Sequence, residues 1–116
     1  MNTDYRTLIH KLDAAWNSHD LERILDFYSE DFELTSPNIK RHLNLPDGTI
    51  KGKACVREWW GKILALHPDL RSELVSVTEC IDSVAYAFRS SYTGTVTVSV
   101  FSFDERGKIR KEFYYT

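Results

Sequence analysis

Hydrophobic residues recur at helical spacing in three segments of the chain. Over residues 3–17 they fall at i, i+1, i+4, i+7 and i+8, which is the apolar stripe of an amphipathic helix. A second stripe, 21–29, follows Asp20, whose carboxylate can accept the backbone N–H groups of a first helical turn. A third covers 53–66 and ends two residues before Pro68. We therefore predict a helix over each of these segments.

Alternating hydrophobic and polar residues predict β-strands elsewhere. The segment 31–37 alternates over a short run that ends in proline and is predicted to be a strand. The segment 38–52 is expected to be a loop or a loose hairpin, turned at Pro46-Asp47-Gly48. The last third of the chain is strand-like throughout, and turn residues divide it into four runs: 70–79, 83–92, 95–103 and 108–115.

This order of elements predicts an α+β domain in which helices cover one face of an antiparallel sheet. The run 95–103 can bury both of its faces, because three valines alternate with a second set of residues that includes Phe101 and Phe103. A sheet that is apolar on both sides needs cover on both sides. We expect helices on one face and a second copy of the chain on the other, in a homodimer.

Composition narrows the class of protein. A chain of 116 residues buries a single core, so we expect one domain over 1–116. Hydrophobic residues make up 42% of the chain, which is typical of a folded globule, and the net charge of -2 argues against nucleic-acid binding. Neither a signal-peptide pattern nor a membrane-spanning apolar run occurs in the sequence, so we expect a cytoplasmic protein with no membrane partner.

The sequence contains no pattern typical of a metal or cofactor site. His10, His42 and His67 share no ligand spacing, and Cys55 and Cys80 are expected to be reduced thiols. His19 and Asp20 resemble a catalytic dyad on paper. Their position between two predicted helices favours a turn and a helix cap instead. We therefore expect no metal and no cofactor.

Three stretches then carry a family resemblance: "AAWNSHDLERILDFYSEDFELTSP" at 14–37, "IKGKACVREWW" at 50–60 and "FSFDERGKI" at 101–109. With the order of elements, they resemble the nuclear-transport-factor-2-like superfamily, and its SnoaL-like polyketide cyclase and ketosteroid isomerase branches in particular. The resemblance implies a cone, also described as a cystatin-like α+β roll. A curved, mixed but mostly antiparallel sheet and three helices of the N-terminal half would enclose a deep pocket, and such proteins are commonly dimeric.

The resemblance disfavours ketosteroid isomerase activity. The general base of those isomerases would fall at Ser36, just before the proline that ends the first strand. Their two oxyanion-hole donors would fall at Leu12 and Ser99. Proton abstraction needs a base and the oxyanion needs acidic donors, and these three residues supply neither.

The SnoaL-like cyclases resembled here use a histidine and an aspartate on the last strand. Glu112 stands at the histidine position and Tyr114 at the aspartate position. Because side chains alternate along a strand, both residues share one face. If that face is concave, a carboxyl group in an apolar pocket would have a raised pKa and could exchange protons with a ligand.

The sequence thus predicts a pocket for a small hydrophobic or aromatic molecule, with Glu112 and Tyr114 as candidate catalytic residues. Candidate lining residues come from the helices and from both ends of the sheet: Trp16, Tyr28, Phe32, Ser36, Phe88, Ser99 and Phe101. One hypothesis is a cofactor-independent cyclase, isomerase or dehydratase that works by acid-base catalysis. The other is a binding or accessory protein that keeps the pocket without the chemistry.

Overall fold

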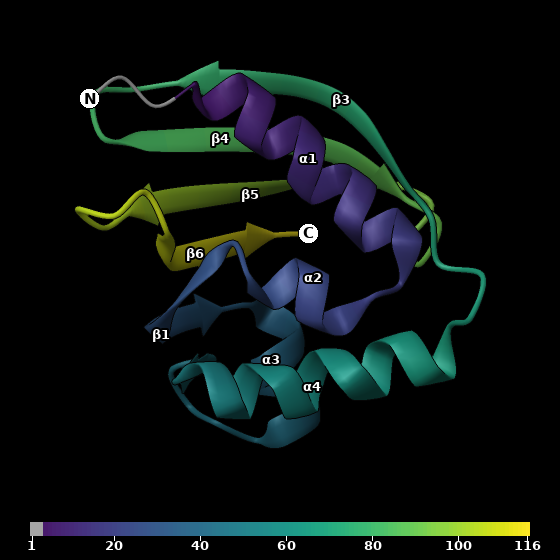
Figure 1. Ribbon diagram of the computed structural model, residues 1–116. Helices are drawn as coiled ribbons and strands as arrows, with labels where there is room; N and C mark the ends of the chain where they lie inside the picture. The colour runs from purple at the N-terminus through teal and green to yellow at the C-terminus, as the bar shows by residue number, and fades with distance from the viewer. Residues whose placement is uncertain (1–3) are drawn as a thin grey trace.

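The computed structural model describes residues 4–116, which form four helices and one six-stranded sheet (Figure 1). The helices are α1 (Tyr5–Ser18), α2 (Leu21–Leu25), α3 (Pro37–Leu43) and α4 (Lys53–Leu66). The strands are β1 (Tyr28–Thr35), β2 (Thr49–Lys51), β3 (Ser72–Glu79), β4 (Ser83–Ser90), β5 (Val96–Phe103) and β6 (Ile109–Tyr115). The predicted first helix is confirmed from Tyr5 onward, and its expected start at Thr3 lies outside the described residues.

The sheet has the strand order β2-β1-β6-β5-β4-β3. β1 runs parallel to β6, whereas every other neighbouring pair is antiparallel, so the sheet is mixed. The sheet is strongly curved, and α1 crosses it beside β3 while α4 lies against β1 (Figure 1). The predicted α+β architecture with a curved mixed sheet is confirmed.

Residues between α1 and α2 have the structural role that their position predicts. His19 ends α1 with φ 62, in the left-handed region, and its Nε2 donates a hydrogen bond to the Leu70 carbonyl. The Asp20 side chain accepts from the Arg23 backbone N–H at 3.2 Å and caps α2. The pair therefore joins two helices and anchors the segment that leads into β3.

Two predicted elements were wrong in extent or kind. The second helix ends at Leu25 instead of Ser29, because the chain turns and begins β1 at Tyr28. The segment 38–52 is not a loop: it contains α3 and the short strand β2, which pairs with β1. Pro37 occupies the first turn of α3, where its missing N–H has no consequence. The proline that was expected to close the first strand instead opens a helix, and β1 already ends at Thr35.

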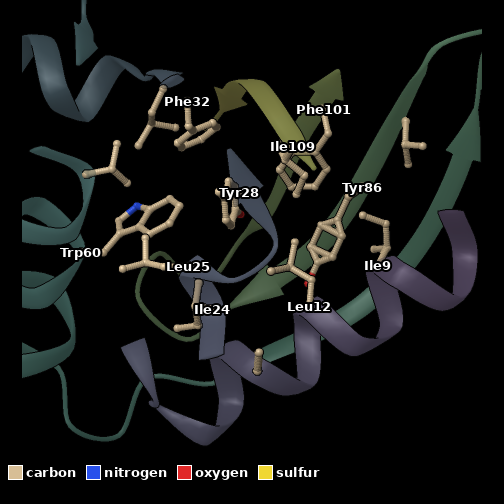
Figure 2. Packing of buried hydrophobic residues seen from close by; sticks show 14 of the residues in the cluster. Ile9, Leu12, Ile24, Leu25, Tyr28, Phe32, Trp60, Tyr86, Phe101 and Ile109 are labelled. Atoms are coloured by element: carbon tan, nitrogen blue, oxygen red, sulfur yellow. The ribbon is translucent and has the colours of Figure 1, made fainter. Parts of the chain in front are cut away.

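The hydrophobic core fills the space between the helices and the concave face of the sheet (Figure 2). Tyr28 and Phe32 of β1 contact Trp60 of α4, with ring centroids 5.0 and 5.9 Å from the indole. Phe101 of β5 lies 6.5 Å from Tyr28 and 6.1 Å from Tyr86. This aromatic cluster packs one end of the cone and leaves a cavity beside it.

Candidate ligand pocket

A partly open cavity of about 120 Å³ lies between the concave face of the sheet and helices α1 and α4. Hydrophobic side chains form most of its wall: Trp16, Leu34, Trp59, Trp60, Ile63, Leu70, Phe88, Tyr92 and Tyr114. Polar and charged groups are fewer: Asn17, Ser36, Asn38, Arg71, Ser72, Ser90, Ser99 and Glu112. All three tryptophans of the chain are among these residues. Their indole groups therefore report directly on this cavity.

The volume of the cavity limits the size of a ligand. An apolar cavity of about 150 Å³ in a protein core holds one benzene molecule. Pockets for drug-sized ligands begin at about 300 Å³. A cavity of about 120 Å³ thus accommodates one ring or a branched chain of similar size, and anything larger must extend through the mouth.

Glu112 is the carboxyl group at the floor of this cavity. It lies on β6 between Leu34 of β1 and Phe101 of β5, and only 6% of its surface is exposed. Its Oε2 accepts a hydrogen bond from the Ser99 hydroxyl at 2.7 Å. Among residues 4–116, its Oε1 has no hydrogen-bond partner. A buried carboxyl oxygen without a partner is costly, so a polar group supplied by a ligand would be stabilising there.

The surroundings of Glu112 keep a proton on it near neutral pH. Burial raises the pKa of Glu112 from 4.5 to about 7, because the apolar wall disfavours the charged form. The Ser99 hydroxyl and the neighbouring Tyr28 hydroxyl act in the opposite direction, because they favour the carboxylate. A group that is about half protonated at neutral pH can both donate and accept a proton.

Tyr114 lies two residues further along β6 and also lines the cavity. It pairs with Ser99 across the β5–β6 ladder, and its ring centroid is 6.3 Å from that of Phe88. Burial raises the pKa of the Tyr114 phenol above its usual value of 10, so the hydroxyl keeps its proton at neutral pH. The two candidate catalytic residues therefore face the same cavity, one as a titratable carboxyl group and one as a hydrogen-bond donor.

The structure separates the candidate lining residues into two groups. Trp16, Ser36, Phe88 and Ser99 form part of the cavity wall. Three others do not reach the cavity: Tyr28, Phe32 and Phe101. They are correctly placed on inward-facing positions, but they pack against one another in the core behind the wall, and this is a correction to the expected lining.

The positions equivalent to isomerase catalytic residues have structural roles here. The Ser36 hydroxyl accepts from the Asn38 backbone N–H at 3.1 Å and caps α3. Leu12 is buried in the core, and Ser99 donates to Glu112. Each of the three side chains thus has a packing or hydrogen-bonding role within the fold.

One polar part of the wall, where β3 begins, could not be recognised from the sequence. The Asn17 side-chain amide donates to the Ser72 carbonyl at 2.8 Å, and the Ser72 N–H donates to Asn17 Oδ1 at 2.7 Å. The Ser72 hydroxyl also donates to Asp13 at 2.6 Å. Ser72 is 55 positions from Asn17 and 59 from Asp13 in the chain, so no local spacing could indicate that it meets them.

Other classes of site have little support in the described part of the chain. Residues 4–116 hold no group of three or more His, Cys, Asp or Glu side chains that could bind a metal ion. Cys55 and Cys80 are exposed free thiols. None of the described helices combines the length and the apolar character that crossing a bilayer requires.

Sequence comparison assigns the family. The SnoaL-like domain profile matches residues 9–112, and the chain belongs to the SnoaL-like family within the NTF2-like superfamily. No curated protein matches the chain.

Solved structures show the same fold. A SnoaL-like protein of unknown function from Burkholderia thailandensis is 32% identical, with a TM-score of 0.93 over 98% of this chain and 97% of that chain. An NTF2-like protein of unknown function from Cytophaga hutchinsonii is 14% identical, with a TM-score of 0.75 over 99% and 91%. The epoxide hydrolase/cyclase-like enzyme SalBIII, of pyran ring formation in the polyether salinomycin, is 17% identical, with a TM-score of 0.74 over 95% and 88%.

Proposed function

We propose that this SnoaL-like protein binds a small hydrophobic or aromatic molecule that carries an oxygen function, with Glu112 as the group that exchanges a proton with it. One observation carries the proposal: Glu112 lines a mostly apolar cavity with a buried carboxyl group, and the Oε1 of that group has no hydrogen-bond partner among residues 4–116. The protonated carboxyl group donates to a carbonyl, ether or epoxide oxygen, and the ionised form accepts a proton from the same region.

The chemistry that fits this arrangement is cofactor-independent acid-base catalysis by a cyclase, isomerase or dehydratase. Glu112 acts as acid or base, and the Tyr114 hydroxyl donates a hydrogen bond to the same ligand. A pKa of about 7 suits proton transfer in both directions at neutral pH. The resemblance to SalBIII supports this class of reaction, because that enzyme is cyclase-like and shares the fold.

The alternative is a binding or accessory protein without catalysis. It is favoured by Ser36, which stands where a related isomerase holds its base and here caps a helix. A pocket with one proton-exchanging carboxyl group can hold a ligand without completing a reaction.

Exchange of hydrogen for deuterium separates the two functions. We expect cyclohexanone in H₂O to shift the indole N–H resonances of the three cavity tryptophans. In D₂O, its α-protons should exchange faster with the protein than without it. Glu112→Gln should keep the resonance shifts and lose the acceleration. Binding without accelerated exchange in the wild type would favour the accessory protein, and no resonance shift at all would contradict both functions.

We also propose that the protein is a homodimer through the convex face of the sheet. Val96, Phe113 and Tyr115 expose 44%, 43% and 59% of their surfaces there. Exposed aromatic and branched side chains on neighbouring strands are typical of a surface that another chain covers. Sedimentation at micromolar concentration is expected to show a dimer, and a monomer would contradict the proposal.

We further propose that the protein is cytoplasmic. The exposed free thiols of Cys55 and Cys80 support this location, since a reducing compartment preserves them. Fractionation of cells that express the full chain is expected to recover it with the cytoplasmic proteins.

A further inference from the structure

A second polar cluster lies behind the cavity wall, where α1 crosses β3 and β4, and it consists of one carboxyl group and two hydroxyl groups. Asp13 Oδ1 accepts a hydrogen bond from the Ser72 hydroxyl at 2.6 Å and another from the Tyr86 hydroxyl. Figure 2 shows the Tyr86 ring reaching from β4 toward α1. Tyr86 is buried, whereas Ser72 is half-buried and lines the cavity. Ser72 therefore connects the cluster with the ligand space.

The position of Ser72 is fixed from both sides. Its backbone N–H and carbonyl form the two hydrogen bonds with the Asn17 side chain, and its hydroxyl is held by Asp13. Asn17 itself lines the cavity. A residue whose backbone is held by two hydrogen bonds and whose hydroxyl is held by a third loses little further freedom when a ligand binds, so its contact is preorganised.

The direction of the Ser72 proton follows from the chemistry of the cluster. The Ser72 and Tyr86 hydroxyl groups both donate to Asp13 Oδ1, so both of their protons point at this one oxygen. The oxygens of Ser72 and Tyr86 are 3.3 Å apart, but neither has a second proton for the other. Ser72 consequently has unused lone pairs and no proton to offer the cavity. It can only accept.

We infer that Ser72 is a second ligand-binding residue, and that it selects ring-sized molecules that carry a hydroxyl group as a hydrogen-bond donor. The inference rests on the proposed ligand pocket and adds a requirement to it. Glu112 donates a hydrogen bond to a ligand oxygen at one part of the wall, and Ser72 accepts a hydrogen bond from a ligand O–H at another. Asp13 acts through Ser72 as a positioning residue, because it accepts the hydrogen bond of the serine hydroxyl and so directs that proton away from the cavity.

Cyclohexanol and cyclohexanone form a matched pair of probes for this requirement. Both fit the ring-sized cavity and offer an oxygen acceptor, but only the alcohol offers a donor. We expect the wild type to bind the alcohol about three- to tenfold more tightly, which is the net effect of one neutral hydrogen bond. Titrations followed at the tryptophan indole N–H resonances measure both dissociation constants.

Ser72→Ala should bind the two probes within about twofold of each other and leave the ketone affinity at its wild-type value. Ser76→Ala is the matched control on the same strand, where the serine is exposed, and it should keep the alcohol preference. Asp13→Ala is a second test, because it removes the acceptor that holds the serine proton and leaves the Ser72 hydroxyl free to donate as well as accept. The alcohol preference is then expected to disappear.

The outcomes separate this inference from the proposed function. Binding of both probes with an unchanged alcohol preference in Ser72→Ala would overturn the role of Ser72 and leave the pocket intact. Binding of neither probe to the wild type would overturn both. If Ser72→Ala does not fold, Asp13→Ala decides, and a retained alcohol preference in that variant overturns the inference.

Discussion

Phe101 and Phe113 lie on neighbouring strands but on opposite faces of the sheet. Phe101 of β5 is 2% exposed and packs against Tyr28 and Tyr86 on the concave side. Phe113 of β6 is 43% exposed on the convex side. The same residue type therefore stabilises the core in one case and remains as exposed apolar surface in the other. The concave face carries the core and the cavity, and the convex face is the one for which we propose a contact with a second copy.

The largest expected effect of a substitution is on the concave face. Phe101→Ala removes a buried ring from the aromatic cluster and should lower the free energy of unfolding by about 3–5 kcal/mol. Chemical denaturation measures this loss. A loss below about 1 kcal/mol would show that the concave face does not dominate stability, and Val100→Ala, on the opposite face of the same strand, is the matched control.

The second-largest expected effect is a pH dependence of the free energy of unfolding, and Glu112 on the concave face is its source. Its folded pKa of about 7 exceeds the ordinary value of 4.5, so the folded protein holds this proton more tightly than the unfolded chain does. Stability should therefore fall as the pH rises from about 4.5 to about 7 and stay level above, by a total of about 3 kcal/mol from this group.

Denaturation at a series of pH values tests this dependence. Glu112→Gln should remove the fall between pH 4.5 and 7, whereas Glu58→Gln, at an exposed position on α4, should keep it. The same fall in wild type and Glu112→Gln would show that Glu112 is not its source.

A smaller effect is expected from the hydrogen bond between Ser99 and Glu112. Ser99→Ala removes the donor to Oε2, so it should cost about 1 kcal/mol and raise the pKa of Glu112 further. Carboxyl carbon chemical shifts measured during a pH titration report this pKa. Ser102→Ala, on the other face of β5, should leave it unchanged, and a lowered pKa in Ser99→Ala would contradict the proposed geometry.

The smallest effect on the folding of one chain is expected on the convex face. Phe113→Glu should change the free energy of unfolding of the monomer by less than about 1 kcal/mol, because the side chain is half exposed. It should nevertheless shift the sedimentation of the protein from dimer to monomer, because it buries a charge in the proposed interface. A dimer that survives Phe113→Glu would place the interface on another surface.

Residues close in sequence account for the parts of the site that could be predicted. Glu112 and Tyr114 share a face because strand side chains alternate, and Asp20 caps a helix because it precedes an apolar stripe. The helix α3 could not be predicted, since its seven residues give too short a pattern and Pro37 suggested an end instead of a beginning. The sequence could not predict which aromatic residues line the cavity and which pack in the core, because both environments favour the same side chains.

The sequence by itself determined the periodicity of the helices and strands, the family, and the carboxyl group on the last strand. These features depend on neighbouring residues and on the geometry of each element. Only the tertiary structure decided which face of the sheet is concave and that Ser72 meets Asp13 across 59 positions. The curvature of the sheet and the crossing of α1 produce those contacts. Contacts between residues far apart in the chain thus form the polar part of the cavity wall, and no local sequence pattern predicts them.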